Sequence, residues 1–326
     1  MAALTPAEGL LAADIGGTHA RFLFGPDAGF PLDLPTRDYH TLDELMADAL
    51  ARLPVRTPGH TDAVLAVAGP VHAGRAALTN LPWTADAAAL RQRFGLRRVA
   101  LINDLEALAR GLAGQPPQEA AMLRRGAADG GRCLVISVGT GLGTAYWALS
   151  DGKLHIEPAE AGHAGFAPAE DWEMEFLRTL RRDYGERVSW ERVLSGPGLS
   201  LLEAFGRKGE ALTPAEVVHR AASGDDAAVT ALRRFSRLLG AFAGDLVLSA
   251  PARGGVWLAG GVLAGLGPLF DTGAFLQAFD AKGRLSPLLG SVPVHRTDDG
   301  SLGVRGALLA ARAGHHAYRR DLWASA

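Results

Sequence analysis

The distribution of apolar residues along the chain predicts alternating strands and helices. Largely apolar runs of the kind found in buried strands cover residues 10–15, 63–68, 98–102, 133–138 and 256–259. Apolar residues recur at helical spacing in residues 42–53, 86–94, 105–112, 172–180, 229–248 and 303–312. Because strands that alternate with helices build α/β proteins, we expect an α/β fold whose ligands collect outside the strand ends.

Two of the predicted strands run into a turn of glycine and threonine and then into a second strand. The turns contain Gly16, Gly17 and Thr18 in the first unit, and Gly139, Thr140 and Gly141 in the second. A P-loop or a dinucleotide fingerprint would need a helix after the glycines, and G-x-x-x-x-G-K-[ST] does not occur in the chain. Either turn alone could be a tight hairpin, but two copies indicate a phosphate chain held by backbone amides and hydroxyls.

Asp14 immediately precedes the first of these turns. Its carboxylate is placed to hold a water molecule on Mg²⁺. Only three lysines occur, Lys153, Lys208 and Lys282, so a phosphate site here must rely on amides, hydroxyls, arginine or a metal ion.

A polar pair ends the strand predicted at residues 98–102. Asn103 and Asp104 follow the apolar run, and Leu105 begins a helical pattern. A carboxylate between a strand end and a helix start is well placed to act as a base, because the helix dipole favours its ionised form. The alternative is that Asn103 or Asp104 only caps the helix.

Asparagine occurs at two positions, Asn80 and Asn103, and both follow apolar runs. Side-chain amides at strand ends suggest hydrogen bonds to a polar ligand. A turn role is the alternative for Asn80.

Three further motifs lie in the second half of the chain. Glu160 and His163 have i, i+3 spacing, but the intervening glycine favours a loop, and no second copy completes a di-metal site, so we expect hydrogen bonding in place of metal ligation. Glu191 stands one helical turn before a Ser-Gly-Pro break, where a solvated helix glutamate is the alternative. Gly260 and Gly261 would let a flat nucleoside approach the backbone.

Composition narrows the class of protein. With 326 residues, 48% of them hydrophobic, the chain can bury a large core, and its length suggests about two domains. The formal net charge of -2 gives no basic surface for nucleic acid. Cys133 is the single cysteine, which fits a reducing compartment, and neither a signal peptide nor a membrane span is recognised. We therefore expect a soluble cytoplasmic protein with no membrane partner.

Seven motifs in order resemble those of the bacterial glucokinase family, part of the actin-like sugar kinase and ATPase superfamily. The resemblance covers the chain from about Leu10 to about Ala313, which is nearly its whole length. The motifs are Asp14-Ile-Gly-Gly-Thr18, Leu78-Thr-Asn80, Ile102-Asn-Asp104, Gly139-Thr-Gly-Leu-Gly143, Glu160-Ala-Gly-His163, Glu191-Arg-Val-Leu-Ser-Gly-Pro-Gly198 and Leu258-Ala-Gly-Gly261.

The resemblance implies two actin-like, ribonuclease H-like α/β lobes with a central cleft. Residues 1–110 would form a small lobe, rejoined by a C-terminal helix at about 304–326, and residues 111–303 a large lobe. The glycine- and proline-containing stretch of residues 111–131 is the expected boundary. The implied substrates are ATP, with Mg²⁺, and glucose, and the implied assembly is a homodimer.

The resemblance also assigns roles to residues that match the family motifs. Asp104 matches the catalytic base. The sugar ligands would be Asn103, Glu160, His163 and Glu191, with Asn80 close to that pocket. The nucleotide site would comprise Asp14, Ile15, Gly16, Gly17, Thr18, Gly139, Thr140, Gly141, Gly260 and Gly261. No protein group is expected to bind the metal directly, since Mg²⁺ would come with ATP and contact Asp14 through water.

Two positions depart from the family pattern. Ala161 stands where the family usually has glycine, and Val138 where a proline often precedes Gly-Thr-Gly. The first departure bears on hexose preference more than on catalysis. The zinc-binding cysteine cluster of the related repressor and kinase group is absent, so no structural zinc is expected.

The function implied is transfer of the γ-phosphoryl group of ATP to the 6-hydroxyl of glucose. A kinase for another hexose is a near alternative. A sugar-sensing regulator of the same fold would need a DNA-binding segment, and fewer than ten residues precede the first strand. An ATP-driven chaperone or filament relative would share the phosphate turns but have no use for a sugar pocket.

Overall fold

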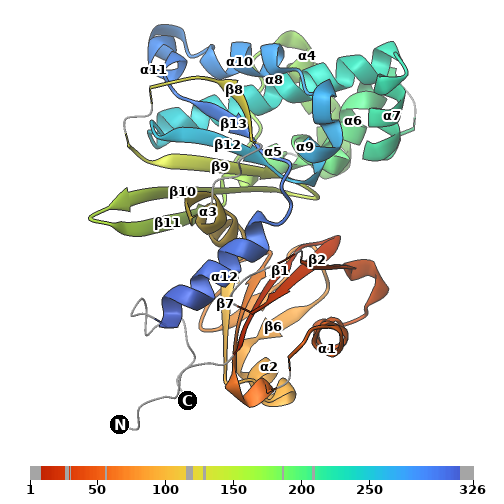
Figure 1. The fold of residues 1–326 in the computed structure, drawn as a ribbon. Coiled ribbons are helices and arrows are strands. Elements are labelled where there is room, and N and C mark those ends of the chain that lie inside the picture. The colour runs from red at the N-terminus through yellow and green to blue at the C-terminus, as the bar shows by residue number, and fades with distance from the viewer. Residues whose placement is uncertain are drawn as a thin grey trace. The chain divides into compact units, whose positions relative to one another are not determined.

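The chain forms two compact units, each built on its own β-sheet (Figure 1). The structure, a computed structural model, describes residues 9–25, 29, 31–55, 57–114, 120–127, 130–185, 187–207 and 210–315. Unit 1 comprises Met1–Pro116 and Gly300–Ala326, and unit 2 comprises Pro117–Asp299. The last residues of the expected C-terminal helix, from 316 onwards, lie outside the described ranges.

Unit 1 contains a five-stranded sheet in the order β3-β2-β1-β4-β7. Strands β1, β4 and β7 are parallel, and β2 and β3 continue the sheet as antiparallel neighbours. The strands are β1 (Gly9–Ile15), β2 (His19–Phe24), β3 (Leu32–Pro35), β4 (Thr61–Val67) and β7 (Arg98–Asn103), with a separate pair β5 (Arg75–Ala77) and β6 (Thr84–Asp86). The helices are α1 (Leu42–Arg52), α2 (Ala87–Phe94), α3 (Asp104–Gly114) and α12 (Leu302–His315), with 3₁₀ turns η1 (Thr36–Asp38) and η2 (Pro58–His60).

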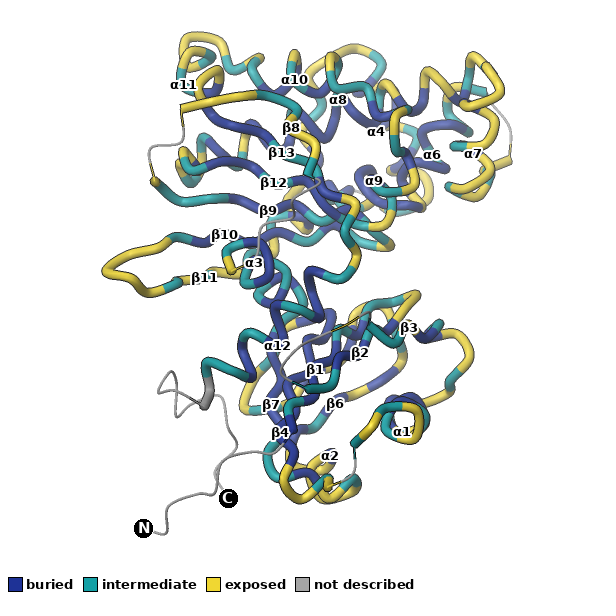
Figure 2. The backbone as a smooth tube through the Cα atoms, in the orientation of Figure 1, coloured by how far each residue is buried: buried dark blue, intermediate teal, exposed yellow. Residues whose placement is uncertain are grey.

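Helices cover both faces of this sheet, because side chains alternate between the faces along each strand. In β1, Leu11 and Ile15 pack with Met46 of α1 in one core cluster. Ala12 packs with Ala107 of α3 and Val304 of α12 in another. Figure 2 shows the resulting buried interior along β1 and β4. A continuous apolar run is therefore the sequence pattern of strands buried on both sides.

Helices α3 and α12 pack so closely that side chains are excluded at their contact. A Cβ atom on Gly111 would lie 2.2 Å from the carbonyl oxygen of Leu302, and one on Gly306 would lie 1.7 Å from that of Ala107. Unit 1 is thus completed by a helix from the far end of the chain.

Asp62, near the start of β4, is fully buried beside two arginines. Arg97 and Arg98 donate from their Nε atoms to Asp62 Oδ1 over 2.8 and 3.1 Å. Burial alone would raise the pKa of Asp62, but the hydrogen bonds from Arg98 and Arg97 outweigh it and hold that pKa below its ordinary value. The pair of arginines compensates a carboxylate that would otherwise be costly to bury.

Unit 2 repeats the strand order of unit 1. Its sheet runs β11-β10-β9-β12-β13-β8, with β10 and β11 antiparallel neighbours, β12 and β13 parallel to β9, and β8 an added antiparallel edge. The predicted repetition of the strand–turn–strand pattern is therefore confirmed. The strands are β8 (Ala121–Arg124), β9 (Cys133–Val138), β10 (Leu142–Ser150), β11 (Lys153–Ala159), β12 (Gly255–Ala259) and β13 (Val294–Arg296).

The helices of unit 2 pack against one large apolar core. They are α4 (Asp171–Tyr184), α5 (Trp190–Val193), α6 (Gly196–Arg207), α7 (Pro214–Ala222), α8 (Asp226–Ser249), α9 (Gly261–Leu266), α10 (Thr272–Asp280) and α11 (Ser286–Gly290), with 3₁₀ turns η3 (Ala161–His163), η4 (Gly267–Leu269) and η5 (Gly283–Leu285). Helix α8 is the central one, and Leu232, Phe235, Leu239 and Phe242 are buried as its periodicity predicts.

Among the described residues, no single helix has the length and apolar composition needed to cross a membrane. The bent pair Gly261–Leu269 and Thr272–Asp280 meets that test by length and composition only. Its aromatic residues Phe275 and Phe279 are fully buried in the core of unit 2.

Candidate active site

Two of the predicted site segments of unit 1 emerge at one edge of its sheet, together with the segment that follows β4. In the strand register Ile15 pairs with Val67, and Val67 pairs with Asn103. Because these strands are parallel, the turn after β1, the segment after β4 and the Asn103-Asp104 corner lie at the same carboxyl edge. Ligands of open α/β sheets bind at such edges.

The turn after β1 is held by hydrogen bonds to its backbone. Gly16 N–H donates to His19 O over 3.0 Å, and the buried Thr36 donates from Oγ1 to Gly17 O over 2.9 Å. Thr36 N–H also donates to Thr18 O over 3.0 Å. Ile15 is fully buried, so it can reach a ligand only through its backbone, whereas Thr18 is exposed.

Asp14 lies at the end of β1 against the first turn of α12. Its Oδ2 atom is 2.2 Å from the position that a Cβ atom of Gly303 would occupy. Burial raises the pKa of Asp14 to about 6, and the positive charge of Arg21 opposes this rise. Arg21 in turn pairs with Asp33, with 3.0 Å between Nε and Oδ2.

Asn103 caps helix α3, which was one of the two roles that the sequence left open for this residue. Its Oδ1 atom accepts hydrogen bonds from the backbone N–H groups of Leu105 (2.9 Å) and Glu106 (3.2 Å). Its Nδ2 atom donates to Gly69 O over 3.1 Å. A sugar-binding role for Asn103 stays a prediction and would use the second N–H of Nδ2.

Asp104 is the first residue of α3 and is partly buried. Its Oδ1 atom accepts a hydrogen bond from Leu105 N–H over 2.9 Å. The carboxylate is therefore oriented by the helix start, at the same sheet edge as the turn of Gly16, Gly17 and Thr18.

Asn80 does not follow a strand directly, so the interpretation of this residue as a strand end was wrong. Strand β5 stops at Ala77, and Asn80 is exposed in a turn. The preceding Thr79 donates from its backbone N–H to Ala68 O over 3.0 Å, just after β4. The turn containing Asn80 is thereby attached beside the sheet edge that carries Asn103.

The glycine turn of unit 2 is held at both ends. Gly139 N–H donates to Gly141 O over 2.9 Å, and Gly196 N–H, at the start of α6, donates to Gly139 O over 2.9 Å. A Cβ atom on Gly139 would have no other atom within 4 Å, so the outer side of the turn is open. Backbone amides in such a turn can bind phosphate oxygens.

Gly260 and Gly261 are adjacent, but the space available for a side chain differs sharply between them. Gly260 has φ of +109°, and a Cβ atom there would lie 2.3 Å from Val138 O. Gly261 opens α9, and a Cβ atom there would meet nothing within 4 Å. Gly260 is therefore required for packing β12 against β9, while Gly261 borders open space.

Glu160, His163 and Glu191 come together on unit 2. His163 Nε2 lies 3.7 Å from Glu160 Oε2, and His163 Nδ1 lies 3.9 Å from Glu191 Oε1. Glu191 Oε2 accepts a hydrogen bond from Leu142 N–H over 3.1 Å, so it is not a purely solvated glutamate. Gly162 permits this arrangement, because a Cβ atom there would lie 2.1 Å from Leu142 O.

These three side chains have the hydrogen-bonding groups that a sugar site would need, and their role as sugar ligands stays a prediction. The two carboxylates accept hydrogen bonds, and the imidazole can both donate and accept one. Across the described ranges no group of three or more His, Cys, Asp or Glu residues could hold a metal ion.

Two residues that support the site were missed by reasoning from the sequence. Thr36 holds the turn of Gly17 and Thr18, as described above, and Arg187 donates from a terminal guanidinium nitrogen to His163 O over 2.6 Å. Both contacts join residues distant in the chain, so no local pattern signals them.

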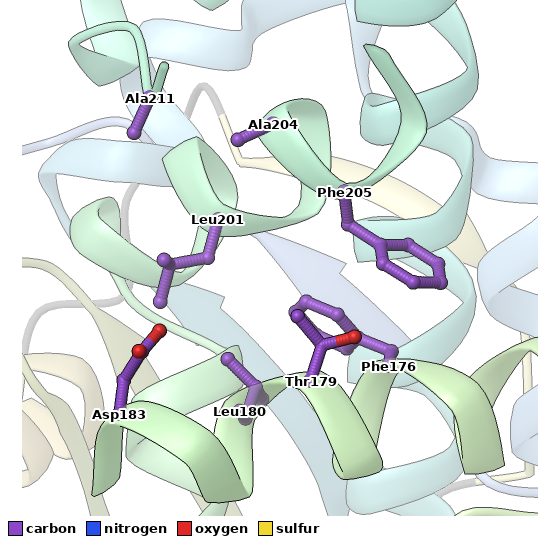
Figure 3. A pocket seen from close by; sticks show the side chains of 8 residues that line it. All are labelled: Phe176, Thr179, Leu180, Asp183, Leu201, Ala204, Phe205 and Ala211. Atoms are coloured by element: carbon purple, nitrogen blue, oxygen red, sulfur yellow. The ribbon is translucent and has the colours of Figure 1, made fainter. Parts of the chain in front are cut away.

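A cavity of about 270 Å³ lies between α4 and α6 (Figure 3). None of the residues that line it was predicted to bind sugar or nucleotide. They are Phe176, Thr179, Leu180, Asp183, Leu201, Ala204, Phe205 and Ala211. Most are apolar, so the cavity lacks the convergent polar groups of the sheet edges.

Comparison with known proteins identifies the family. The sequence profile described as "Glucokinase" matches residues 11–314 of this chain. The chain belongs to the glucokinase family. A glucokinase of Caulobacter vibrioides is 38% identical over 298 residues, which cover 87% of this chain and 89% of that protein.

Solved structures of glucokinases have the same fold, which is that of the actin-like sugar kinases. The glucokinase of an Antarctic psychrotroph has a TM-score of 0.78 at 28% identity, covering 94% of this chain and 99% of that one. A ROK family glucokinase from Streptomyces griseus, solved with glucose and AMPPNP, has a TM-score of 0.65 at 20% identity and covers 94% of this chain and 100% of that one. The predicted fold class and family resemblance are confirmed.

Proposed function

We propose that this chain is an ATP-dependent glucokinase, which transfers the γ-phosphoryl group of ATP to the 6-hydroxyl of glucose and releases glucose 6-phosphate and ADP. Membership of the glucokinase family over residues 11–314 carries this proposal. The placement of Asp104 at the sheet edge that also carries Gly16, Gly17 and Thr18 supports it.

Asp104 acts as the catalytic base in this proposal. Phosphoryl transfer to a hydroxyl needs in-line placement and charge neutralisation more than covalent help. The Leu105 N–H bond orients the Asp104 carboxylate, which would align the 6-hydroxyl and accept its proton. Such a base contributes about 10²–10⁴-fold to the rate.

The sugar would be recognised by Glu160, His163 and Glu191, with Asn103 and Asn80 as further partners. Glu160 and His163 are exposed here, so the sugar itself would have to bury them. Once they are buried, a missing hydroxyl would leave polar groups unpaired, which can reject a wrong sugar by about 10⁴–10⁵-fold. The contacts of His163 with both carboxylates support a common pocket for these three residues. Closure around the sugar would exclude water as a competing acceptor.

The nucleotide would be bound by the two glycine turns and by the segment of Gly260 and Gly261. Mg²⁺ fits this chain as an ion carried by ATP, because it binds through one or two carboxylates together with substrate phosphates. Asp14, a carboxylate held beside the first turn, would contact it through water. When bound, the ion neutralises charge on the transferring phosphoryl group. Asp14 itself must be ionised for that role.

We further propose that the enzyme works as a homodimer in the cytoplasm and supplies glucose 6-phosphate to glycolysis. The family resemblance supports the dimer, and the single cysteine fits a reducing compartment. Light scattering on the purified chain would give the mass of two copies if the dimer is correct and the mass of one if it is wrong.

Coupled measurement of ADP release tests the function directly. Glucose should support turnover far better than mannose, fructose or N-acetylglucosamine, and Asp104→Asn should lower kcat by about 10²–10⁴-fold. Because an asparagine Oδ1 can keep the bond from Leu105 N–H, this variant should fold and bind glucose. Near-full activity of Asp104→Asn would refute the assignment of the base.

Other outcomes would point to the alternative functions. Preference for another sugar would make the chain a different hexose kinase. Glucose binding without ADP release would favour a sugar-sensing protein, and ATP hydrolysis that ignores sugar would favour a chaperone or filament relative.

A further inference from the structure

The backbone of Leu142 is contacted on one side by Glu191 and on the other by Gly162, which lies between Glu160 and His163 in the chain. Leu142 directly follows the turn of Gly139, Thr140 and Gly141 and begins β10. Its N–H group donates to Glu191 Oε2 over 3.1 Å, and its carbonyl oxygen packs against Gly162, between Glu160 and His163. The exit of the phosphate turn is therefore in direct contact with the sugar pocket.

The entrance of the same turn is held by the segment that follows Glu191. Gly196 N–H donates to Gly139 O over 2.9 Å. Glu191 lies on α5, and Gly196 begins α6. These two helices pack closely against each other, since a Cβ atom on Gly198 would lie 2.2 Å from Val193 O. The buried Ser195 accepts a hydrogen bond from Gly198 N–H over 3.2 Å. A short, tightly packed segment thus brackets both ends of the turn.

We propose that Glu191 is a positioning residue for the nucleotide in addition to being a sugar ligand. One carboxylate oxygen, Oε2, fixes the exit of the phosphate turn through Leu142 N–H, while the other, Oε1, faces His163 and the sugar. Through this one carboxylate the enzyme holds its nucleotide turn in the binding geometry before sugar arrives. The inference rests on the proposed function, because it concerns the ATP site of that enzyme.

The distinguishing measurement is the affinity for ADP, with Mg²⁺ and without any sugar, by calorimetry. Glu191→Ala should weaken ADP binding by about tenfold or more, since a hydrogen bond to a charged group is lost. Glu191→Gln keeps an oxygen acceptor of the same reach, so its ADP affinity should stay within about twofold of the wild type, even though its glucose affinity falls. A residue that only binds sugar would leave ADP affinity unchanged in both variants.

Two variants make the comparison decisive. His163→Ala removes a neighbouring sugar ligand that does not bond Leu142, so it should weaken glucose binding and leave sugar-free ADP affinity unchanged. Glu191→Asp keeps the charge but is one methylene shorter, so it should bind ADP as weakly as Glu191→Ala. This variant replaces Glu191→Ala if the alanine variant does not fold.

The inference is overturned if Glu191→Asp or Glu191→Ala binds ADP as tightly as the wild type, or if His163→Ala weakens ADP binding equally. Failure of the proposed function would look different. In that case the wild type itself would bind no ADP or would not phosphorylate glucose.

Discussion

Asp14 and Gly303 are in contact although they lie near opposite ends of the chain. The Oδ2 atom of Asp14 lies 2.2 Å from the place where a Cβ atom on Gly303 would be. The carboxylate beside the first phosphate turn is therefore positioned by the beginning of the last helix, and only glycine leaves room for it.

Replacing Gly303 by alanine should displace Asp14. Because the methyl group would overlap the carboxylate, Asp14 or α12 must move, and a displacement of about 1 Å at an active site can cost about 10²-fold in kcat. Gly265→Ala is the control, since its Cβ atom would meet nothing within 4 Å. Steady-state kinetics with glucose and ATP measure the effect. Wild-type kcat in Gly303→Ala would contradict a role for this contact.

Activity should depend on the ionisation of Asp14. Since burial raises the pKa of Asp14 to about 6, its carboxyl group becomes protonated as the pH falls through 6. We expect kcat/KM for ATP, which reports the free enzyme, to fall about tenfold per pH unit below 6. The inflection in kcat should lie at lower pH, because a cation near the carboxylate favours its charged form. A flat kcat/KM profile from pH 8 to pH 5 would contradict this prediction.

Asp62→Asn should destabilise unit 1 without altering the chemistry. The substitution leaves two arginines beside a buried group that no longer carries their compensating charge, at a cost of about 3–5 kcal/mol in the free energy of unfolding. Because the pKa of Asp62 is lowered in the folded state, its contribution is complete above the unfolded pKa of about 3.9 and is lost as the pH falls below it.

Urea unfolding at pH 7 and at acidic pH would measure the contribution of Asp62. Arg93→Ala is the control, because it breaks an exposed pair with Asp43 worth at most about 1 kcal/mol. Asp62 lies at the start of β4, away from its carboxyl end, so kcat should be unchanged. If Asp62→Asn and Arg93→Ala lowered the free energy of unfolding equally, the buried cluster would stabilise the fold no more than an exposed ion pair does.

The neighbouring glycines Gly260 and Gly261 should respond oppositely to alanine. Gly260→Ala would force a methyl group to within 2.3 Å of Val138 O at a φ of +109°, so we expect a clear loss of thermal stability. Gly261→Ala meets open space and should keep the melting temperature while raising KM for ATP. A stable Gly260→Ala variant would argue against the packing role of Gly260, and an unchanged KM for ATP in Gly261→Ala would argue against a nucleotide-binding role of Gly261.

Much of the framework was predictable because its signals are local. The strand–turn–strand units around Gly16 and Gly139 could be recognised since a buried strand, a glycine turn and a second strand follow one another directly. The periodicity of Leu232, Phe235 and Leu239 likewise predicted a buried helix. For Asn103, the local pattern left two roles open, and the structure shows the capping role.

The remaining features depend on contacts between distant residues. Glu191 accepts a hydrogen bond from the backbone N–H of Leu142, a group that almost every residue type has. No residue near Glu191 in the chain indicates this contact. The contact of Asp14 with Gly303 exists only once α12 has packed on unit 1. Asn80 was misplaced because an apolar run, Ala76 to Leu78, reads as strand although the pairing with β6 ends at Ala77. Tertiary pairing decides such short segments.

The close packing of α12 on α3 has a consequence for the order of folding during synthesis. When the first 116 residues leave the ribosome, α12, which covers part of one face of their sheet, has not yet been made. This N-terminal third of the chain therefore keeps part of its core open to water. Residues 117–299 form an uninterrupted unit and can fold as soon as they emerge. We therefore expect the middle of the polypeptide to fold before its beginning. A ribosome stalled before Leu302 should carry a chain whose first 116 residues are sensitive to protease.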